Sequence, residues 1–200
     1  MHYILLIVPW FATFAMTVQL GLWSNAILLA QIVFSGLVAF GFYQPLAVLL
    51  DEQTGGEYTY FMDFLSIWAL YCGSMLILKI LDGALSKKRV RFQKQVDQIG
   101  GPVVGFVSGA VMTGIVMASL HAAPLSPETM KIDRADIATT SSFTAPDLAW
   151  LRLVEAATEA ASFGSGDNRL FVEDYVVLYA SRREAFAETD SFRVKRSGAR

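Results

Sequence analysis

The first quarter of this 200-residue chain contains almost no charge, because no Asp, Glu, Lys or Arg occurs between residues 3 and 50. One bilayer crossing needs roughly 20 apolar residues, so this run is long enough for two crossings and too long for one. Hydrophobic residues make up 54% of the whole chain, which is high for a soluble domain. The sequence therefore predicts an integral membrane protein.

Residue types that carry redox, metal or nucleophilic chemistry are scarce. Cys72 is the only cysteine, so an internal disulfide is excluded, and its apolar surroundings disfavour a reactive thiolate. His2 and His121 are the only histidines, and they assemble no zinc site or nucleophile–histidine pair. The glycines lack the Lys-Ser/Thr of a phosphate-binding loop. We expect no enzymatic activity, no cofactor and no metal, and a membrane-anchored enzyme ranks last among the function classes.

Turn-forming residues divide the apolar sequence into segments. Residues 21–25 combine a glycine, an interfacial tryptophan and two polar residues, which is typical of a connection between helices. The first run lacks the basic start of a signal peptide, so we expect a retained helix. Pro102 suits the first helical position of the last segment. The predicted fold is an all-α integral membrane protein in which residues 1–121 form four transmembrane helices, at about 3–22, 26–49, 61–81 and 102–121.

The local distribution of charge predicts the orientation. The loop at residues 82–98 contains five basic residues between positions 87 and 94, whereas the loop at 51–59 has three acids and no base. Short basic loops stay in the cytoplasm. We therefore expect loop 82–98 in the cytoplasm and both termini outside it. A site for nucleic acid or a specific anionic lipid is a weaker interpretation of the basic loop, and the net charge of -2 gives no overall attraction to nucleic acid.

Small residues recur every fourth position in the last apolar segment. Gly101, Gly105, Gly109 and Thr113 would form one smooth strip on a helix. In water the interior glycines would weaken the helix by roughly 1 kcal/mol each. In lipid such a strip allows another helix to approach closely. The spacing therefore predicts a helix-packing face.

A few polar side chains lie within the predicted spans, where ionisable groups are costly and are functional candidates by default. Lys79 and Asp82 are one turn apart, close enough for an ion pair, and Asp63 lies near the opposite end of the same span. All three are near helix ends, where an anchoring role at the membrane boundary is favoured. Gln31 either lines a polar path or bonds to a neighbouring helix.

The composition changes after residue 121. Residues 122–145 are rich in Ser, Thr, Pro and charge, which predicts a linker. Residues 146–200 predict a small, mostly helical extracytoplasmic tail, with helices from about 146 to 162 and from about 169 to 188; a short strand near Val172 and Val176 is the alternative. Such a tail is too short to bury a core alone. We expect it to pack on the membrane helices or on a partner, or to be partly ordered.

One combination of residues resembles a known family. Asp97, Gly100, Gly101, Gly105 and Gly109 follow a polar loop and lead into the fourth predicted span. This arrangement resembles the colicin V production protein (CvpA) family over about residues 21–125. The family usually has an Arg-Gly pair after its first helix, where this chain has Trp23-Ser24-Asn25.

The resemblance implies a protein of the bacterial cytoplasmic (inner) membrane linked to toxin export and envelope physiology. A non-enzymatic scaffold or accessory factor is the first hypothesis. A small channel or transporter, assembled from several copies around the glycine faces, is the second. The expected partners are the lipid bilayer and, through the tail, a second copy of the chain or an envelope protein.

Overall fold

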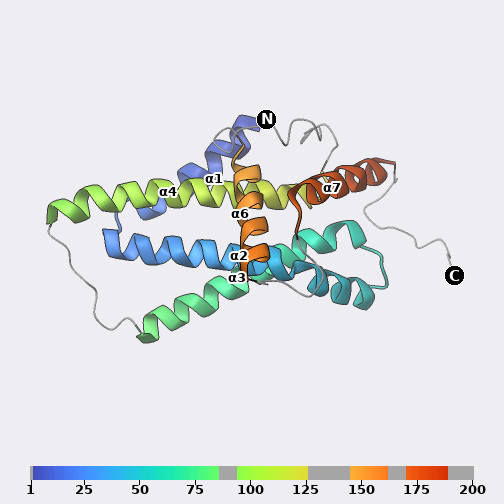
Figure 1. Ribbon diagram of the computed structural model, residues 1–200, viewed down its shortest axis with the longest axis horizontal. Helices are drawn as coiled ribbons and strands as arrows, with labels where there is room; N and C mark the ends of the chain where they lie inside the picture. Colours follow the sequence, from blue (N-terminus) through green and yellow to red (C-terminus); the bar gives the residue numbers. More distant parts are fainter. Residues whose placement is uncertain (1, 86–93, 126–144, 162–169, 189–200) are drawn as a thin grey trace.

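The described part of the computed structural model comprises residues 2–85, 94–125, 145–161 and 170–188, and within it every regular element is a helix (Figure 1). The predicted all-α class is confirmed, and the alternative of a strand near Val172 is wrong because a helix begins there. The helices are α1 His2–Thr17, α2 Leu22–Gln53, α3 Thr59–Leu85, α4 Lys94–His121, α6 Pro146–Ala161 and α7 Val172–Ala187.

Three of the helices are long and apolar enough to cross a membrane: α2, residues Thr59–Gly83 of α3 and residues Gln95–His121 of α4. The chain is therefore a multi-pass membrane protein. Helix α2 has 32 residues, roughly 48 Å of helix against a hydrocarbon core of about 30 Å. Helix α1 has only 16 residues, or about 24 Å. A fourth crossing by α1 stays a prediction.

The helix ends follow the turn signals but not the limits of the apolar runs. Helix α1 ends at Thr17, and α2 starts directly after Gly21, which is its N-terminal cap. Between α2 and α3, Gly55 and Gly56 have φ values of 69° and 74°, a left-handed conformation that glycine adopts without strain.

The expected position of Pro102 is wrong, because α4 begins at Lys94 and Pro102 lies inside it. The apolar run marks the part of the helix suited to lipid, whereas the helix itself continues into polar sequence at residues 94–98. Membrane helices tolerate such a proline, since neighbouring groups or water satisfy the freed carbonyl.

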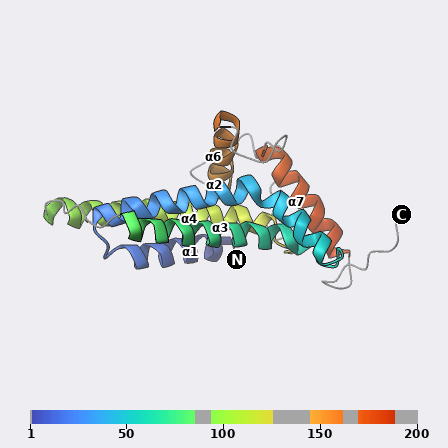
Figure 2. The ribbon, with the colours of Figure 1, turned by 90° about the horizontal axis from the view of Figure 1, so that it is seen from below.

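The helices pack in a simple order: α1 lies on α4, α4 on α2, and α2 on α3. In Figure 1 the three long helices lie lengthwise, and α6 crosses α4 and α2. Seen from below, α6 projects from one side of the bundle. Helix α7 begins beside α6 and slopes toward the loop between α2 and α3 (Figure 2).

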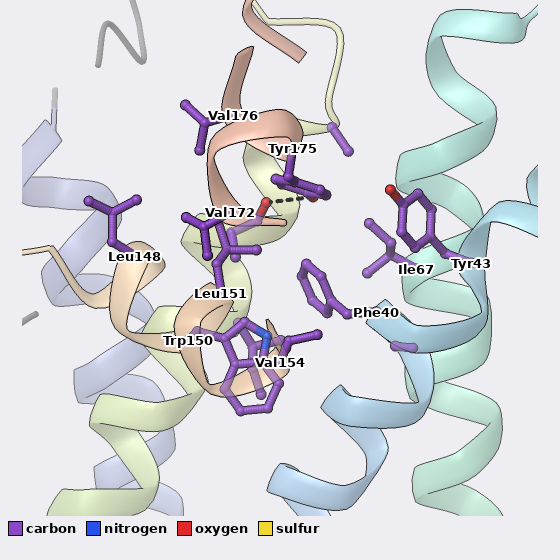
Figure 3. Packing of buried hydrophobic residues seen from close by; sticks show 14 of the residues in the cluster. Phe40, Tyr43, Ile67, Leu148, Trp150, Leu151, Val154, Val172, Tyr175 and Val176 are labelled. Atoms are coloured by element: carbon purple, nitrogen blue, oxygen red, sulfur yellow. Dashed lines mark hydrogen bonds between the residues drawn. The ribbon is translucent and has the colours of Figure 1, made fainter. Parts of the chain in front are cut away.

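The main core lies where the tail helices meet the bundle. Phe40 of α2 lies against Trp150 of α6 and Tyr175 of α7, with ring centroids 6.1 Å apart in both pairs (Figure 3). Leu148, Leu151 and Val154, the apolar stripe of α6, are all fully buried. Helices α6 and α7 thus complete the core of the bundle, and they bury apolar surface that they could not bury alone.

Two segments on which predictions were made lie outside the described residues. They are residues 86–93 of the basic loop and residues 126–144 of the expected linker. The predicted boundaries of that linker therefore stay predictions, as does the orientation that the basic loop implies.

Candidate functional site

The start of α4 holds the turn between α1 and α2. Asp97 lies in the first turn of α4, and its Oδ1 accepts a hydrogen bond from the backbone N–H of Leu22 at 2.8 Å. This carboxylate therefore caps α2, where unpaired N–H groups and the helix dipole favour negative charge. Gly100 faces Leu22, because a Cβ at Gly100 would lie 2.9 Å from Leu22 Cδ1. The aspartate and the first glycine of the motif thus position a second helix.

The three glycines that follow lie against α1 and the connection that follows it. A Cβ added at Gly101, Gly105 or Gly109 would lie 2.5 Å from Leu20 O, 2.8 Å from Thr17 Oγ1 and 2.9 Å from Trp10 O, respectively. These separations are too short for a real side chain, so only glycine allows α1 this close. Thr113, the last member of the strip, is buried, and its hydroxyl donates to Gly109 O at 2.9 Å within α4.

Asn25, a polar residue of the predicted turn, completes this junction. It is fully buried, and its Nδ2 donates to Thr17 O, Leu20 O and Gly101 O at 3.0, 3.2 and 2.8 Å. One amide thereby ties the end of α1 and the glycine strip of α4 to the start of α2. An asparagine in the first turn of an apolar helix is the sequence signal for such a role, because a polar group in a membrane helix needs a hydrogen-bond partner.

The polar candidates within the predicted spans fall into two places. Gln31, Lys79 and Asp82 line one open cavity of about 710 Å³, formed by the end of α1, the first half of α2 and the end of α3. Gln31 Nε2 donates to Leu78 O at 3.5 Å. Within the described part of the chain, the expected ion pair between Lys79 and Asp82 is not formed.

Asp63 lies at the opposite end of α3, where it contacts α7. Its Oδ2 forms an ion pair with Arg182 Nη1 and accepts a hydrogen bond from the Tyr179 hydroxyl at 2.8 Å. The Arg182 side chain is 37% exposed, so solvent screens this pair and its contribution to stability is small. Asp63 is thus one of the residues that fix α7 to the bundle.

A buried pair joins the end of α4 to the start of α6. His121 Nε2 donates to Asp147 Oδ2 at 2.9 Å, and the two residues are 0% and 4% exposed. Burial opposes ionisation of Asp147, but the hydrogen bond and charge of His121 and two backbone N–H groups outweigh it, so the pKa of Asp147 lies below its usual value. The pair spans 26 residues of sequence, and no spacing rule connects them.

Helix α7 satisfies the last carbonyl groups of α4. Arg183 Nη1 donates to His121 O at 2.7 Å, and the Tyr175 hydroxyl donates to Ala118 O at 3.0 Å. A helix end leaves such carbonyls without intrahelical partners. Burial raises the pKa of Tyr175 well above its usual value, so its hydroxyl stays protonated and able to donate.

Two further glycines allow α6 to pack closely on the bundle. They do not belong to the four-residue repeat, so that repeat did not predict their role. A Cβ at Gly36 would lie 2.4 Å from Trp150 Cζ2, and one at Gly114 would lie 2.6 Å from Pro146 O. Gly114 is one residue beyond the strip and faces a different neighbour. In the described residues, no three His, Cys, Asp or Glu side chains are placed to hold a metal ion.

This arrangement defines a helical membrane protein in which the start of the fourth helix clamps the first two, through an aspartate and a run of glycines. The family model of the colicin V production protein matches residues 2–146, and the chain belongs to that family. The match extends beyond the expected residues 21–125 to include α1 and ends at the first residue of α6. Comparisons with curated proteins and with solved structures gave no significant match. Family membership indicates a role in colicin V production.

Proposed function

We propose that this protein acts by binding, as a non-enzymatic scaffold or accessory factor for production or export of a colicin V-like toxin and for the physiology of the envelope. One observation carries the proposal: α6 and α7 are fixed to the membrane helices by buried polar contacts yet keep large apolar side chains exposed. Phe171 and Leu178 of α7 are 50% and 42% exposed. Exposed apolar side chains on a rigid element favour contact with a partner.

The surface around these side chains suits a basic or amphipathic partner. Glu173, Asp174, Glu184 and Glu188 are all on the exposed side of α7. Acidic groups around an apolar centre resemble the rim and core of transient interfaces. The proposed occupant is an envelope protein rather than the lipid surface, because these carboxylates would be repelled by anionic headgroups.

The proposed location is the cytoplasmic (inner) membrane, with α6 and α7 on the outer side. The basic loop at 82–98 and the acids around residue 52 support this orientation. With Cys72 replaced by alanine, a cysteine at Thr54 should react with an impermeant maleimide in intact cells, and one at Gln95 should not. Both positions are exposed. The opposite labelling pattern would contradict the orientation.

The structure also determines how the binding proposal is tested. Deleting the chain after Pro124 would strip cover from Phe40 and His121, both buried under the tail, and loss of function would then report misfolding. A double change of exposed residues, Phe171→Glu with Leu178→Glu, leaves the core intact. The matched control is Ala185→Glu with Ala187→Glu, which adds the same two charges to exposed positions of α7 without removing a large apolar side chain.

The readout is restoration of toxin secretion in a strain that lacks the protein, with the amount of protein in the membrane measured in parallel. We expect the double variant to reach wild-type levels in the membrane but to fail in secretion, whereas the control restores it. A photoreactive amino acid at position 178 should also crosslink to an envelope protein. Full restoration by the double variant would exclude this surface as the binding site.

The second candidate function is a small channel or transporter, and the cavity lined by Gln31, Lys79 and Asp82 favours it. The glycine strip is already occupied by α1, so copies of the chain would have to meet through another face. Solute or ion flux in proteoliposomes that is lost on Lys79→Met or Gln31→Leu supports transport. Wild-type flux no greater than that of empty liposomes, or flux that is unchanged in both variants, argues against it.

A further inference from the structure

We propose that the cavity between α1, α2 and α3 binds one phospholipid with a zwitterionic, primary-amine headgroup, that is, phosphatidylethanolamine. The cavity is open, has a volume of about 710 Å³ and has one apolar wall and one charged end. Met16 of α1, Leu20 of the connection between α1 and α2, and Ile27 and Leu28 of α2 contribute to the apolar wall. Lys79 and Asp82 of α3 form the charged end. No residue that lines this site belongs to α6 or α7, and the proposal is independent of the function proposed above.

The two charges face the same space without neutralising each other. Lys79 and Asp82 are three residues apart on α3, which places both on one side of the helix. Each lines the cavity, and within the described residues neither forms an ion pair. An ionisable group in a membrane-spanning helix is costly unless it meets an opposite charge or water. One zwitterion supplies both opposite charges.

The order of the charges matches the order of groups in that headgroup. Helix α3 ends at Leu85, so Lys79 is one turn farther from the helix end than Asp82. In a phospholipid the phosphate is attached to the glycerol, and the ammonium group is the outermost part. The phosphate would therefore contact Lys79 and the ammonium would contact Asp82. The backbone positions of the two residues are about 4.5 Å apart along the axis, which is comparable with the length of the two-carbon link of ethanolamine.

The depth of the cavity also fits a lipid that enters from the side. Trp23, in the first turn of α2, is one of the lining residues, and indole rings prefer the membrane interface. From there the cavity extends along α2 to Gln31 and across to Met75 of α3. An acyl chain would follow this direction into the hydrocarbon. A lipid with an anionic headgroup would leave Asp82 facing a phosphate without an ammonium group between them.

The test measures lipid binding by the delipidated full-length protein in detergent, by native mass spectrometry. Phosphatidylethanolamine, phosphatidylcholine and phosphatidylglycerol with identical acyl chains are compared. We expect the ethanolamine lipid to bind about tenfold tighter than the choline lipid, because a trimethylated ammonium cannot donate hydrogen bonds to Asp82. Asp82→Asn should remove this preference, and Lys79→Met should weaken all three lipids. Glu159→Gln, an exposed carboxylate of α6, is the control and should change nothing.

Equal binding of all three lipids by the wild-type protein would overturn the proposal. Tightest binding of phosphatidylglycerol would also overturn it. Retention of the ethanolamine preference in a folded Asp82→Asn protein would also overturn it. If either charge variant fails to fold, thermal melting of the wild-type protein decides: ethanolamine lipid should raise the melting temperature more than choline lipid does. Equal shifts would contradict the site.

Discussion

The two halves of α4 meet their neighbours in different ways. In the first half, Gly101, Gly105 and Gly109 let Leu20 O, the Thr17 hydroxyl and Trp10 O approach α4 closely, and the capping carboxylate of Asp97 and the amide of Asn25 satisfy polar groups. In the second half, large side chains of α6 and α7 cover the helix, and the pairs His121–Asp147 and Asp63–Arg182 join them to the bundle. The first contact is close approach between backbones, and the second is burial of side chains.

This difference separates the two tasks of the molecule. Helices in lipid gain little from hydrophobic burial, so small residues and van der Waals contact hold α1 on α4. Helices α6 and α7 contain charged residues on their outer sides, and their apolar stripes are buried by the bundle. The first half of α4 is therefore built for the membrane, and the second half for holding a tail.

The largest effect on stability is expected where α6 packs on the second half of α4. Trp150→Ala should lower the free energy of unfolding in detergent by about 3–5 kcal/mol, because Trp150 is 3% exposed and fills the space over Gly36. Leu153→Ala on the same helix is the control, since Leu153 is 44% exposed and should cost far less. Limited proteolysis should show earlier cleavage of the tail in the tryptophan variant. Equal stability of the two variants would mean that α6 does not depend on this contact.

For the first half of α4, which packs on α1, the sharpest test compares a glycine of the strip with an unpacked glycine of α3. Gly101→Ala should cost about 1–3 kcal/mol, because the new Cβ would meet Leu20 O at 2.5 Å and a backbone atom cannot move aside easily. Gly73→Ala on α3 has no heavy atom within 4 Å and should stabilise the protein by up to about 1 kcal/mol through helix propensity. Thermal melting in one detergent measures both. The same sign for both changes would argue against close packing at the strip.

A smaller effect, which depends on pH, is expected for Asp147. Since its pKa is lowered in the folded state, its contribution to stability is complete above the unfolded pKa of about 3.9 and is lost as the pH falls through the lower folded value. Asp147→Asn should therefore melt below the wild type near neutral pH, and the gap should close in acid. Glu159→Gln, an exposed acid on α6, is the control. A gap that persists in acid would show that ionisation of Asp147 is not its source.

The smallest effect is expected at the cap of α2. Asp97→Ala removes the acceptor for the Leu22 N–H and should cost about 1 kcal/mol. Gln98→Ala, at the exposed neighbouring position, should be close to neutral. If both variants melt at the same temperature, the carboxylate does not stabilise the start of α2.

Particular residues show how far the sequence reaches. The uncharged run at residues 3–50, the turn at Gly21 and the helical pattern from about 146 to 162 each predicted an element that the structure contains. Periodicity and turn chemistry are local, so they can be read without knowing the fold. The start of α4 was predicted eight residues late, at Pro102 instead of Lys94, because hydropathy reports where lipid begins and not where a helix begins.

What the sequence determined by itself is therefore the class of protein, the helices and the spacing of the glycine strip. Only the tertiary structure decided that α1 occupies that strip, that Asp97 caps a different helix, and that Lys79 and Asp82 face a cavity instead of each other. The same holds for His121 with Asp147 and for Asp63 with Arg182, which are 26 and 119 residues apart. Such pairs depend on how helices cross, and a crossing is fixed by the fit of whole surfaces, not by any local pattern.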